Sequence, residues 1–454
     1  MRIDIDGAYT TLIGKGRGNL SVEDRRVVTN IVNGVVRLKR RLDFYIDELH
    51  VGYFERLGKE APPMDIKVRQ ILRIAAFELV VNGKPSHATT AFVDMTKRIP
   101  KMAWATGMVN NMVRKIANET PELPACDEDA VPNDAVVKSL GTRHSHPDWI
   151  VARWLDRFGR SACVELLEAN NSLGEHHLKY SVRSNHPSFT FDDLRRFCID
   201  ADITCEPSAW LPNEFFEVSK GLSSLVKSGL LDGGSVSVQD VSSGLVVTLL
   251  DPQPQERILD TCAAPGGKLF HAASKMRYEG EIVALDRNEG RMQALHRRAK
   301  NATSGLPDTL DLRTFGGMDL ASWSRKNEGV VFDRVLLDAP CTGTGVLLKR
   351  PDLRWRRTEQ DLQELTEIQR TLLSEAAKHV AVGGCLVYST CSVEREENFG
   401  QVERFLASHA HFEHDVDAAT RLLPDALCSE GCLQSFPHVH GIDGAFAARF
   451  RRTR

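Results

Sequence analysis

Two cysteines at the ends of short apolar runs are the residues of this sequence best suited to chemistry. Cys341 lies in DAPCTGTG, residues 338–345, and Cys391 lies in YSTCS, residues 388–392. A thiolate can add to C6 of a pyrimidine and make C5 electron-rich enough to attack a methyl sulfonium, which is covalent catalysis. Asp338 is suited to offset the negative charge that the ring acquires at N3. A second thiol could assist the later step, in which the C5 proton leaves and the first thiol is expelled. Either cysteine alone would more often be an inert buried thiol, but two beside an acid favour a catalytic pair.

The residues after the apolar run RILD (257–260) form a turn in which a ligand could approach the backbone. The sequence there is DTCAAPGGKLFHAAS, with small residues at Ala263, Ala264, Gly266 and Gly267. A helix that begins at this turn offers free N–H groups and a partial positive charge to an anion such as a carboxylate. The turn is not the GxGxxG fingerprint of dinucleotide-binding folds, which disfavours a hydride-transfer enzyme.

Two acids at the ends of later strands complete a possible nucleoside pocket. Asp286 ends EIVALD (281–286), where an acid can accept hydrogen bonds from ribose hydroxyls; a helix-capping aspartate is the alternative. Asp319 follows two glycines and is placed to meet an adenine amino group, although aspartate after glycine is also common in turns. A carboxylate-binding turn, a ribose acid and an adenine acid together predict a pocket for S-adenosylmethionine.

A basic segment, LLKRPDLRWRRTEQ (347–360), follows the first thiol closely in sequence. Basic residues interleaved with an aromatic ring suit contacts to RNA phosphates together with stacking on a base. A solvated charged loop is the alternative, and we favour RNA binding. The candidate RNA-binding residues are Lys349, Arg350, Arg354, Trp355 and Arg356, with Arg357 next to them.

The thiols, the turn and the acids all lie in the last part of the chain, where short apolar runs alternate with helical stretches. This alternation predicts a doubly wound, mostly parallel sheet. Ligands bind beyond the carboxyl ends of the strands in such sheets, which is where every unusual residue of this part lies. The runs expected to form strands are 257–260, 281–286, 311–319, 332–338 and 383–392.

The first part of the chain has helical patterning. Apolar residues recur at helical spacing in 28–38, 71–79 and 108–116, and Ser21 suits a helix N-cap. These stripes are expected to form a core. Residues 119–145 contain three prolines and six acids and are expected to include an exposed linker. A helical patch from His146 leads into a mixed α/β segment.

The composition is that of a globular protein with several domains. The chain has 454 residues, 42% hydrophobic residues and a formal charge of −3, so any basic surface must be local. The N-terminus lacks the apolar core of a signal peptide, and no apolar run approaches the length of a membrane span. The ten cysteines form no CxxC pair, and the histidine pairs lack a zinc-like spacing. We therefore expect a cytoplasmic, reduced protein with no metal and no membrane partner.

Taken together, these motifs resemble the RNA (cytosine-5)-methyltransferases of the RsmB/Nop2 type. The resemblance runs through DTCAAPGGK, GGMD, LLDAPCTGTGVLLKRPDLRW, YSTCSVEREEN and GIDGAFAARF, with VQDVSS (238–243) before them. It implies that Cys391 of the TC pair is the nucleophile and that Cys341 assists product release. It assigns S-adenosylmethionine contacts to Asp286, Asp319, Asp338 and the turn formed by Cys262, Ala263, Ala264, Pro265, Gly266, Gly267 and Lys268.

The helical N-terminus resembles a NusB-like RNA-binding fold, in VRQILRIAAFEL and GMVNNMVRKI. The combination implies methylation of a cytosine in small-subunit ribosomal RNA by a monomer. The predicted domains are a NusB-like all-α domain (1–125), an acidic linker (126–145), a small α/β extension (146–235) and a Rossmann-like α/β methyltransferase domain (236–454).

Three alternatives stay open at this point. The chain could be an RNA-binding protein with an inactive methyltransferase domain, which the intact thiols and turn disfavour. It could be a DNA cytosine methyltransferase, which the TC thiol and the helical domain disfavour. It could also act on an RNA other than ribosomal RNA.

Overall fold

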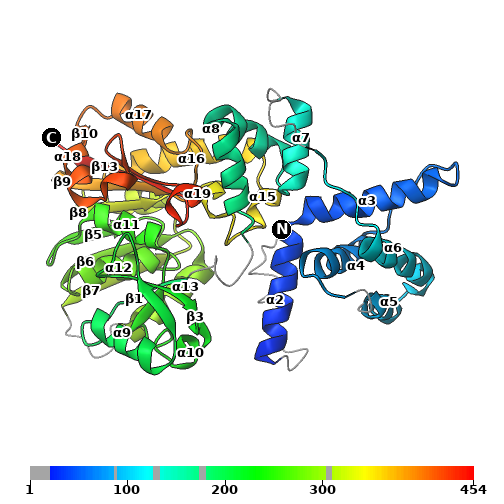
Figure 1. The fold of residues 1–454 in the computed structure, drawn as a ribbon. Helices are drawn as coiled ribbons and strands as arrows, with labels where there is room; N and C mark the ends of the chain where they lie inside the picture. Colours follow the sequence, from blue (N-terminus) through cyan, green and yellow to red (C-terminus); the bar gives the residue numbers. More distant parts are fainter. Residues whose placement is uncertain (1–20, 86–88, 126–132, 173–179, 303–308) are drawn as a thin grey trace. The chain divides into compact units, whose positions relative to one another are not determined.

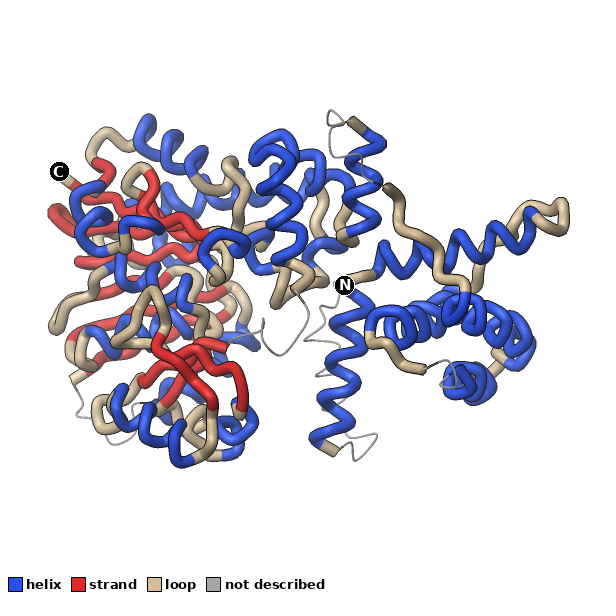
Figure 2. The backbone as a smooth tube through the Cα atoms, in the orientation of Figure 1, coloured by secondary structure: helices blue, strands red, loops and turns tan. Residues whose placement is uncertain are grey.

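A computed structural model describes residues 21–85, 89–125, 133–172, 180–302 and 309–454. It forms two compact units, of which the helical unit comprises residues 1–171 and 347–356 and the sheet unit comprises the remaining residues. Figures 1 and 2 show that the described part of the helical unit contains helices and no strand, whereas all strands drawn belong to the sheet unit. The N-terminal segment that lacks a signal-peptide pattern, residues 1–20, lies outside the described residues.

The helical unit has a core of apolar residues at the predicted helical spacing. Leu42, Leu72 and Val109 are fully buried in it. The stripes expected at 71–79 and 108–116 are confirmed, because both face this core. The predicted N-cap is also confirmed, since Ser21 and Asp24 form a capping box. The elements of this unit are α2 (Val22–Arg37), α3 (Lys39–Glu55), α4 (Ile66–Ala76), η1 (Phe77–Val81), α5 (Thr89–Arg98), η3 (Ala103–Ala105), α6 (Thr106–Asn118), α7 (Asp134–Arg143), α8 (Asp148–Ala169) and α15 (Leu353–Arg356).

The linker expected at 126–145 is wrong for its second half, which forms helix α7. Asn133 caps the helix by accepting hydrogen bonds from the backbone N–H groups of residues 135 and 136. Val136 and Leu140 are buried one helical turn apart, so the segment has an apolar face despite its polar composition. The middle segment predicted for 146–235 is also divided differently, because α8 belongs to the helical unit and the strands that follow belong to the sheet unit.

A small antiparallel sheet with strand order β2-β3-β1-β4 begins the sheet unit. Its core includes Val182, Leu194 and Phe216, which come from two strands and the helix α9. This sheet is the α/β content that the sequence indicated after residue 146. Its elements are β1 (Tyr180–Ser184), α9 (Phe191–Asp200), β2 (Thr204–Pro207), β3 (Phe216–Lys220), α10 (Leu222–Lys227) and β4 (Val236–Val238).

The large sheet has the strand order β11-β12-β13-β9-β8-β5-β6-β7, and β10 pairs with β13. Strands β5 to β9 are parallel, as predicted, and all five expected strands are present. Strand β13 pairs antiparallel with β9. The strands are β5 (Arg257–Asp260), β6 (Gly280–Asp286), β7 (Leu310–Gly316), β8 (Phe332–Asp338), β9 (Val380–Thr390), β10 (Phe412–His414), β11 (Cys428–Ser429), β12 (Cys432–Ser435) and β13 (Ala445–Arg452).

Helices cover both faces of this sheet (Figure 1). Alternate residues of one strand face opposite ways, so Leu336 packs in a core with α11 while Leu337 packs in a core with α14, α16 and α17. The predicted fold class is confirmed: an all-α domain precedes a Rossmann-like α/β domain. The helices are α11 (Val241–Leu250), α12 (Gly267–Lys275), α13 (Glu289–Ala302), α14 (Leu320–Lys326), η4 (Thr344–Val346), α16 (Glu359–Ala377), α17 (Phe399–Ser408), α18 (Val416–Leu422), η5 (Asp425–Leu427) and α19 (Pro437–His440).

Candidate active site

The two cysteines meet at the carboxyl ends of β8 and β9. These strands are parallel neighbours, with Asp338 paired to Ser389, and both chains leave the sheet at the same edge. The Sγ atoms of Cys341 and Cys391 are 3.3 Å apart, within hydrogen-bond distance for sulfur. Cys341 is buried and Cys391 is half-buried. The structure thus brings together two thiols that are fifty residues apart in the chain.

The environment of the two thiols is unequal. The interaction with Cys391 is the largest cause that raises the pKa of Cys341 well above its usual value, and burial adds to it. Cys341 therefore keeps its proton at neutral pH and can donate it toward the sulfur of Cys391.

Asp338 and Lys268 form a half-buried ion pair beside the thiols. The Lys268 Nζ atom lies 2.7 Å from one carboxylate oxygen of Asp338, and the Ser389 hydroxyl donates to the other at 2.8 Å. Burial disfavours the charge of Lys268, but Asp338 outweighs it, so the pKa of the lysine is raised; the sulfur of Cys391 contributes in the same direction. The ammonium group therefore lies within electrostatic range of both the carboxylate and a thiol.

The turn after β5 has the geometry of a site for a ligand with an anionic group. Gly266 is the N-cap of α12 and has φ of +101°, a conformation that favours glycine. A Cβ atom at this position would lie 2.8 Å from the ring of Phe270, so the site also excludes a side chain. The helix that starts here directs its free N–H groups toward the turn. The turn from Cys262 to Lys268 therefore offers donors to an anionic group, and its contact with the carboxylate of S-adenosylmethionine stays a prediction.

The two predicted nucleoside acids have backbone partners in the structure. Asp286, at the end of β6, accepts hydrogen bonds from the N–H groups of Ala264 at 3.2 Å and Asn288 at 2.7 Å. These bonds hold its carboxylate against the turn after β5. Asp319 follows β7 and is the N-cap of α14, accepting from the N–H group of Ser322 at 2.7 Å. Both carboxylates keep lone pairs for a ligand, and the ribose and adenine contacts stay predictions.

Sequence reasoning missed a fourth acid in this site, Asp260, the last residue of β5. Its carboxylate is buried, and burial together with the neighbouring Asp338 raises its pKa to about 7. It accepts from the N–H group of Cys262 at 3.3 Å. The strand-end position was a signal that could have found it, because Asp286 was selected on the same ground.

A second group that sequence reasoning missed ties the two thiol-bearing loops together. Glu397 is buried and accepts from the N–H group of Thr342 at 2.8 Å and from the side chain of Gln369 at 2.9 Å. Its neighbour Asn398 accepts from the hydroxyl of Thr390 at 2.6 Å and donates to the carbonyl of Ser392 at 2.9 Å. One residue thus holds the loop after Cys341, and the next holds the loop around Cys391. Two acids precede this pair in the sequence, so no apolar context marked Glu397 as buried.

The prediction that Arg354 binds RNA is wrong, because its side chain is buried in the helical unit. One amino group donates to the carbonyls of Arg37 at 3.3 Å and Ser145 at 3.1 Å, and the other donates to the carbonyl of Asn170 at 3.0 Å. These carbonyls lie at the ends of α2, α7 and α8, where a helix leaves carbonyl groups without intrahelical partners. Arg354 therefore supplies hydrogen-bond donors to carbonyl groups at the ends of three helices.

Trp355, the predicted stacking residue, also has a structural partner. Its indole N–H donates to the carbonyl of Val36 at 2.6 Å, and Lys39 lies over its ring at 5.3 Å. Arg356 forms an ion pair with Asp352 at 3.0 Å. The remaining candidates, Lys349 and Arg350, are half-buried. RNA binding by Lys349, Arg350 and Arg356 stays a prediction.

Two further findings concern the part of the chain that the structure describes. No group of three or more histidine, cysteine or acidic residues in it could hold a metal ion. Its helices include none that combines the length and apolar character needed to span a bilayer.

Comparisons with known proteins match both parts of the chain to families. Residues 247–451 match the family described as 16S rRNA methyltransferase RsmB/F, and residues 6–118 match the NusB family. The chain is 30% identical to a protein of Bacillus subtilis named probable ribosomal RNA small subunit methyltransferase B, with 100% of this chain and 96% of that protein covered. It is 32% identical to a protein of the same name from Synechocystis, with 95% and 92% covered.

Two solved structures share the fold. The crystal structure of PH0851 aligns with a TM-score of 0.77 and 25% identity, over 99% of this chain and 95% of that one. A methyltransferase homologue from Pyrococcus horikoshii aligns with a TM-score of 0.57 and 25% identity, over 69% of this chain and 97% of that one.

Proposed function

This chain belongs to the 16S rRNA methyltransferase RsmB/F family, and on that premise we propose that it makes 5-methylcytosine in small-subunit ribosomal RNA. The observation that carries the proposal is the 3.3 Å distance between the sulfur atoms of Cys341 and Cys391 at one edge of the sheet. Two thiols in contact, beside an ion pair and a turn that fits S-adenosylmethionine, suit covalent activation of a pyrimidine.

S-adenosylmethionine, when held by the turn 262–268 and Asp286, supplies an electrophilic methyl group. Asp319 is the proposed partner of the adenine amino group. The exposed position of this aspartate, at the N-cap of α14, leaves it accessible to a ligand.

The thiol of Cys391 is the proposed nucleophile. After the thiol proton has passed to solvent, the sulfur forms a bond to C6 of the cytosine, which moves an electron pair toward C5 and N3. The Asp338–Lys268 pair faces the charge that develops on the ring, with the ammonium group as the stabilising cation. Once C5 carries the methyl group, its proton leaves to a base and the C6–S bond breaks, which regenerates the thiolate.

Cys341 is the proposed base for this last proton, once the adduct has formed and its own proton has passed to solvent. Its sulfur lies 3.3 Å from that of the nucleophile, and it is held in place by the backbone around Thr342, which Glu397 anchors. Loss of this thiol should therefore leave the RNA attached to Cys391.

The test uses three cysteine variants of the full chain with RNA and labelled S-adenosylmethionine. We expect Cys391→Ala to abolish methyl transfer, and we expect Cys341→Ala to accumulate a protein–RNA adduct that survives a denaturing gel. Cys205→Ser, a half-buried cysteine in the small sheet, is the matched control and should retain full activity. Full activity of Cys391→Ala would exclude the covalent mechanism.

The substrate and setting follow from the same proposal. Small-subunit ribosomal RNA as substrate is supported by the names of the relatives in Bacillus subtilis and Synechocystis. Action in the cytoplasm, as a monomer, is part of the same proposal. Bisulfite sequencing of ribosomal RNA from cells that lack this protein should show the loss of one 5-methylcytosine. No change at any cytosine would point to another RNA.

A further inference from the structure

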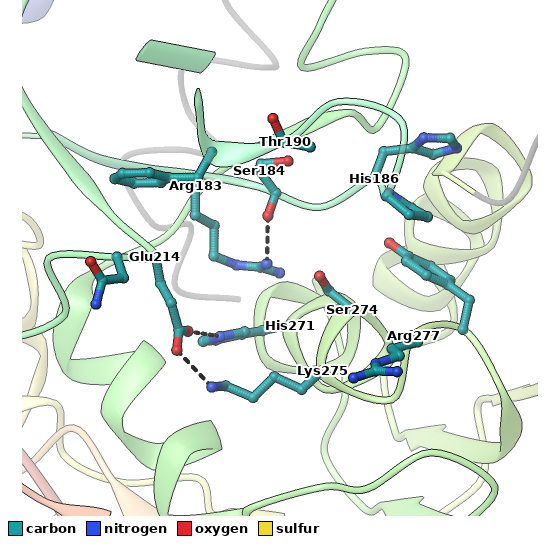
Figure 3. A pocket seen from close by; sticks show the side chains of 13 residues that line it. Arg183, Ser184, His186, Thr190, Glu214, His271, Ser274, Lys275 and Arg277 are labelled. Carbon is teal, nitrogen blue, oxygen red and sulfur yellow. Dashed lines mark hydrogen bonds and ion pairs between the residues drawn. The ribbon is translucent and has the colours of Figure 1, made fainter. Parts of the chain in front are cut away.

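A cavity along helix α12 is not used by the reaction proposed above (Figure 3). It has a volume of about 330 Å³ and lies between the end of β1 with the loop after it, Glu214, and the C-terminal half of α12. The residues that bear on its chemistry are Arg183, Glu214, His271, Ser274, Lys275 and Arg277.

The buried wall of this cavity contains an arginine with an unused donor. The Nε atom of Arg183 donates to the side chain of Gln239 at 2.7 Å, and Nη1 donates to the carbonyl of Ser184 at 3.0 Å. Within the described residues, Nη2 is buried and has no hydrogen-bond partner, and the residue is only 2% exposed. Figure 3 shows the side chain extending from β1 toward the helix that carries His271 and Ser274. A buried donor without a partner is costly in a protein, so a ligand that accepts from it is favoured.

The charges around the cavity leave it positive. Glu214 is paired with His271 at 2.8 Å and with Lys275 at 2.7 Å. Burial opposes its charge, but these two partners hold the pKa of Glu214 at about 2. Burial also lowers the pKa of His271 to about 3, so this histidine is neutral, and of these two partners only Lys275 balances Glu214. Glu214 also interacts electrostatically with Arg183. It is nevertheless the one carboxylate among the lining residues, which also include three cationic side chains, Arg183, Lys275 and Arg277, the last exposed at the rim.

We propose that this cavity binds a phosphate group of the RNA strand, with Arg183 as the donor in the wall and Arg277 as the donor at the rim. Arginine suits phosphate because its donors match the geometry of the oxygens. The strand is the favoured source because the exposed rim lets a chain pass across the cavity. The proposed cofactor turn lies at the other end of α12, on the order of 10 Å away along the helix. The assignment to RNA rests on the proposed function.

The test is the salt dependence of RNA binding by the full chain, measured by fluorescence anisotropy. Each phosphate contact that is lost should reduce the slope of log K against log salt concentration by about 0.7–0.9. We expect that reduction for Arg277→Gln and for Ser274→Asp, which places a carboxylate beside the cavity. Arg421→Gln, an exposed arginine on α18, is the control and should keep the wild-type slope. Wild-type slopes in both cavity variants, or an equal reduction in the control, would overturn the proposal.

Two further measurements are needed. The first distinguishes an RNA phosphate from a small phosphate compound, and the second tests the cavity proposal separately from the proposed function. Inorganic phosphate is titrated while the imidazole signals of His186 and His271 are followed by NMR. Phosphate binding that Ser274→Asp removes, together with an unchanged RNA slope, would assign the cavity to a small phosphate compound and overturn the RNA assignment. If the cavity variants reduce the salt slope but the wild-type chain transfers no methyl group to RNA, the phosphate site is supported and the proposed function is refuted. If the wild-type chain methylates RNA but the cavity variants keep the wild-type slope, only the phosphate site in the cavity is refuted.

Discussion

Removing the carboxylate of Glu397 should loosen the loop that carries Cys341. This carboxylate accepts from the backbone N–H group and the hydroxyl of Thr342 and from the side chain of Gln369. A hydrogen bond to a charged group contributes about 1.5–3 kcal/mol, and every 1.4 kcal/mol is a factor of about ten. In Glu397→Ala, the amide of Thr342 should therefore exchange its hydrogen about 10- to 150-fold faster than in the wild type, if exchange occurs by local opening.

Glu397→Gln gives a graded result, because a neutral acceptor remains in place. Charge-assisted hydrogen bonds are about twice as strong as neutral ones, so about half of the stabilisation should be lost. The amide should then exchange about 3- to 10-fold faster, by the same conversion. The two variants thus predict both the size of the increase in exchange rate and its order, with a larger increase in Glu397→Ala than in Glu397→Gln.

Hydrogen exchange with mass spectrometry on peptides that span 341–346 is the assay. Glu403→Gln is the matched control, since Glu403 is an exposed acid on α17 whose side chain is 64% exposed. The same variants should release the RNA adduct more slowly, because the proposed base is no longer held in place. Wild-type protection of Thr342 in Glu397→Ala would refute the reasoning that this carboxylate anchors the loop.

Three further outcomes follow from other buried groups. Arg354→Ala should lower the free energy of unfolding of the helical unit by about 3 kcal/mol, because several helix-end carbonyls lose their donor; circular dichroism melting measures it, and an unchanged midpoint would contradict the structural role. Gly345→Ala should impair methyl transfer, because the new Cβ would lie 2.2 Å from the carbonyl oxygen of Gly444 and displace the loop after Cys341; wild-type turnover would contradict this. The pKa of Asp260 is about 7 when folded and close to 4 when unfolded, so the folded state binds more protons between these values and stability falls as pH rises through that window. Asp260→Asn should remove this fall, which melting midpoints at pH 5 and pH 8 would reveal; an identical pH dependence in the variant would refute it.

Local pattern was enough to predict the parallel strands and the residues that follow them. Each of the runs 257–260 and 332–338 is apolar, short and bounded by polar residues, and each forms a strand with those bounds. Parallel strands that are neighbours end at the same edge, so the meeting of Cys341 and Cys391 followed from the order of the elements. Strand β13 could not be placed in the same way, because its antiparallel pairing with β9 depends on contacts far apart in the chain.

The errors concern polar residues whose role is set by tertiary contacts. Arg354 stands among other basic residues in the sequence, and no local pattern shows that three helix ends need its donors. Helix α7 follows an acidic, proline-rich stretch. Its two buried apolar residues, Val136 and Leu140, can be recognised as buried only when the residues packed against them are known. Composition describes the average environment of a segment, whereas burial is decided residue by residue.

The asymmetry of the two thiols suggests how the proposed reaction orders its proton transfers. The interaction with Cys391 is the largest cause of the raised pKa of Cys341. Once the sulfur of Cys391 is bonded to carbon, it has no proton to share in a hydrogen bond between two thiols, and no thiolate can form beside Cys341. The pKa of Cys341 should then fall, so this thiol can lose its proton to solvent only after the adduct has formed, and the resulting thiolate accepts the C5 proton. One short sulfur–sulfur contact would thus keep Cys341 protonated before the addition and release it as a base afterwards.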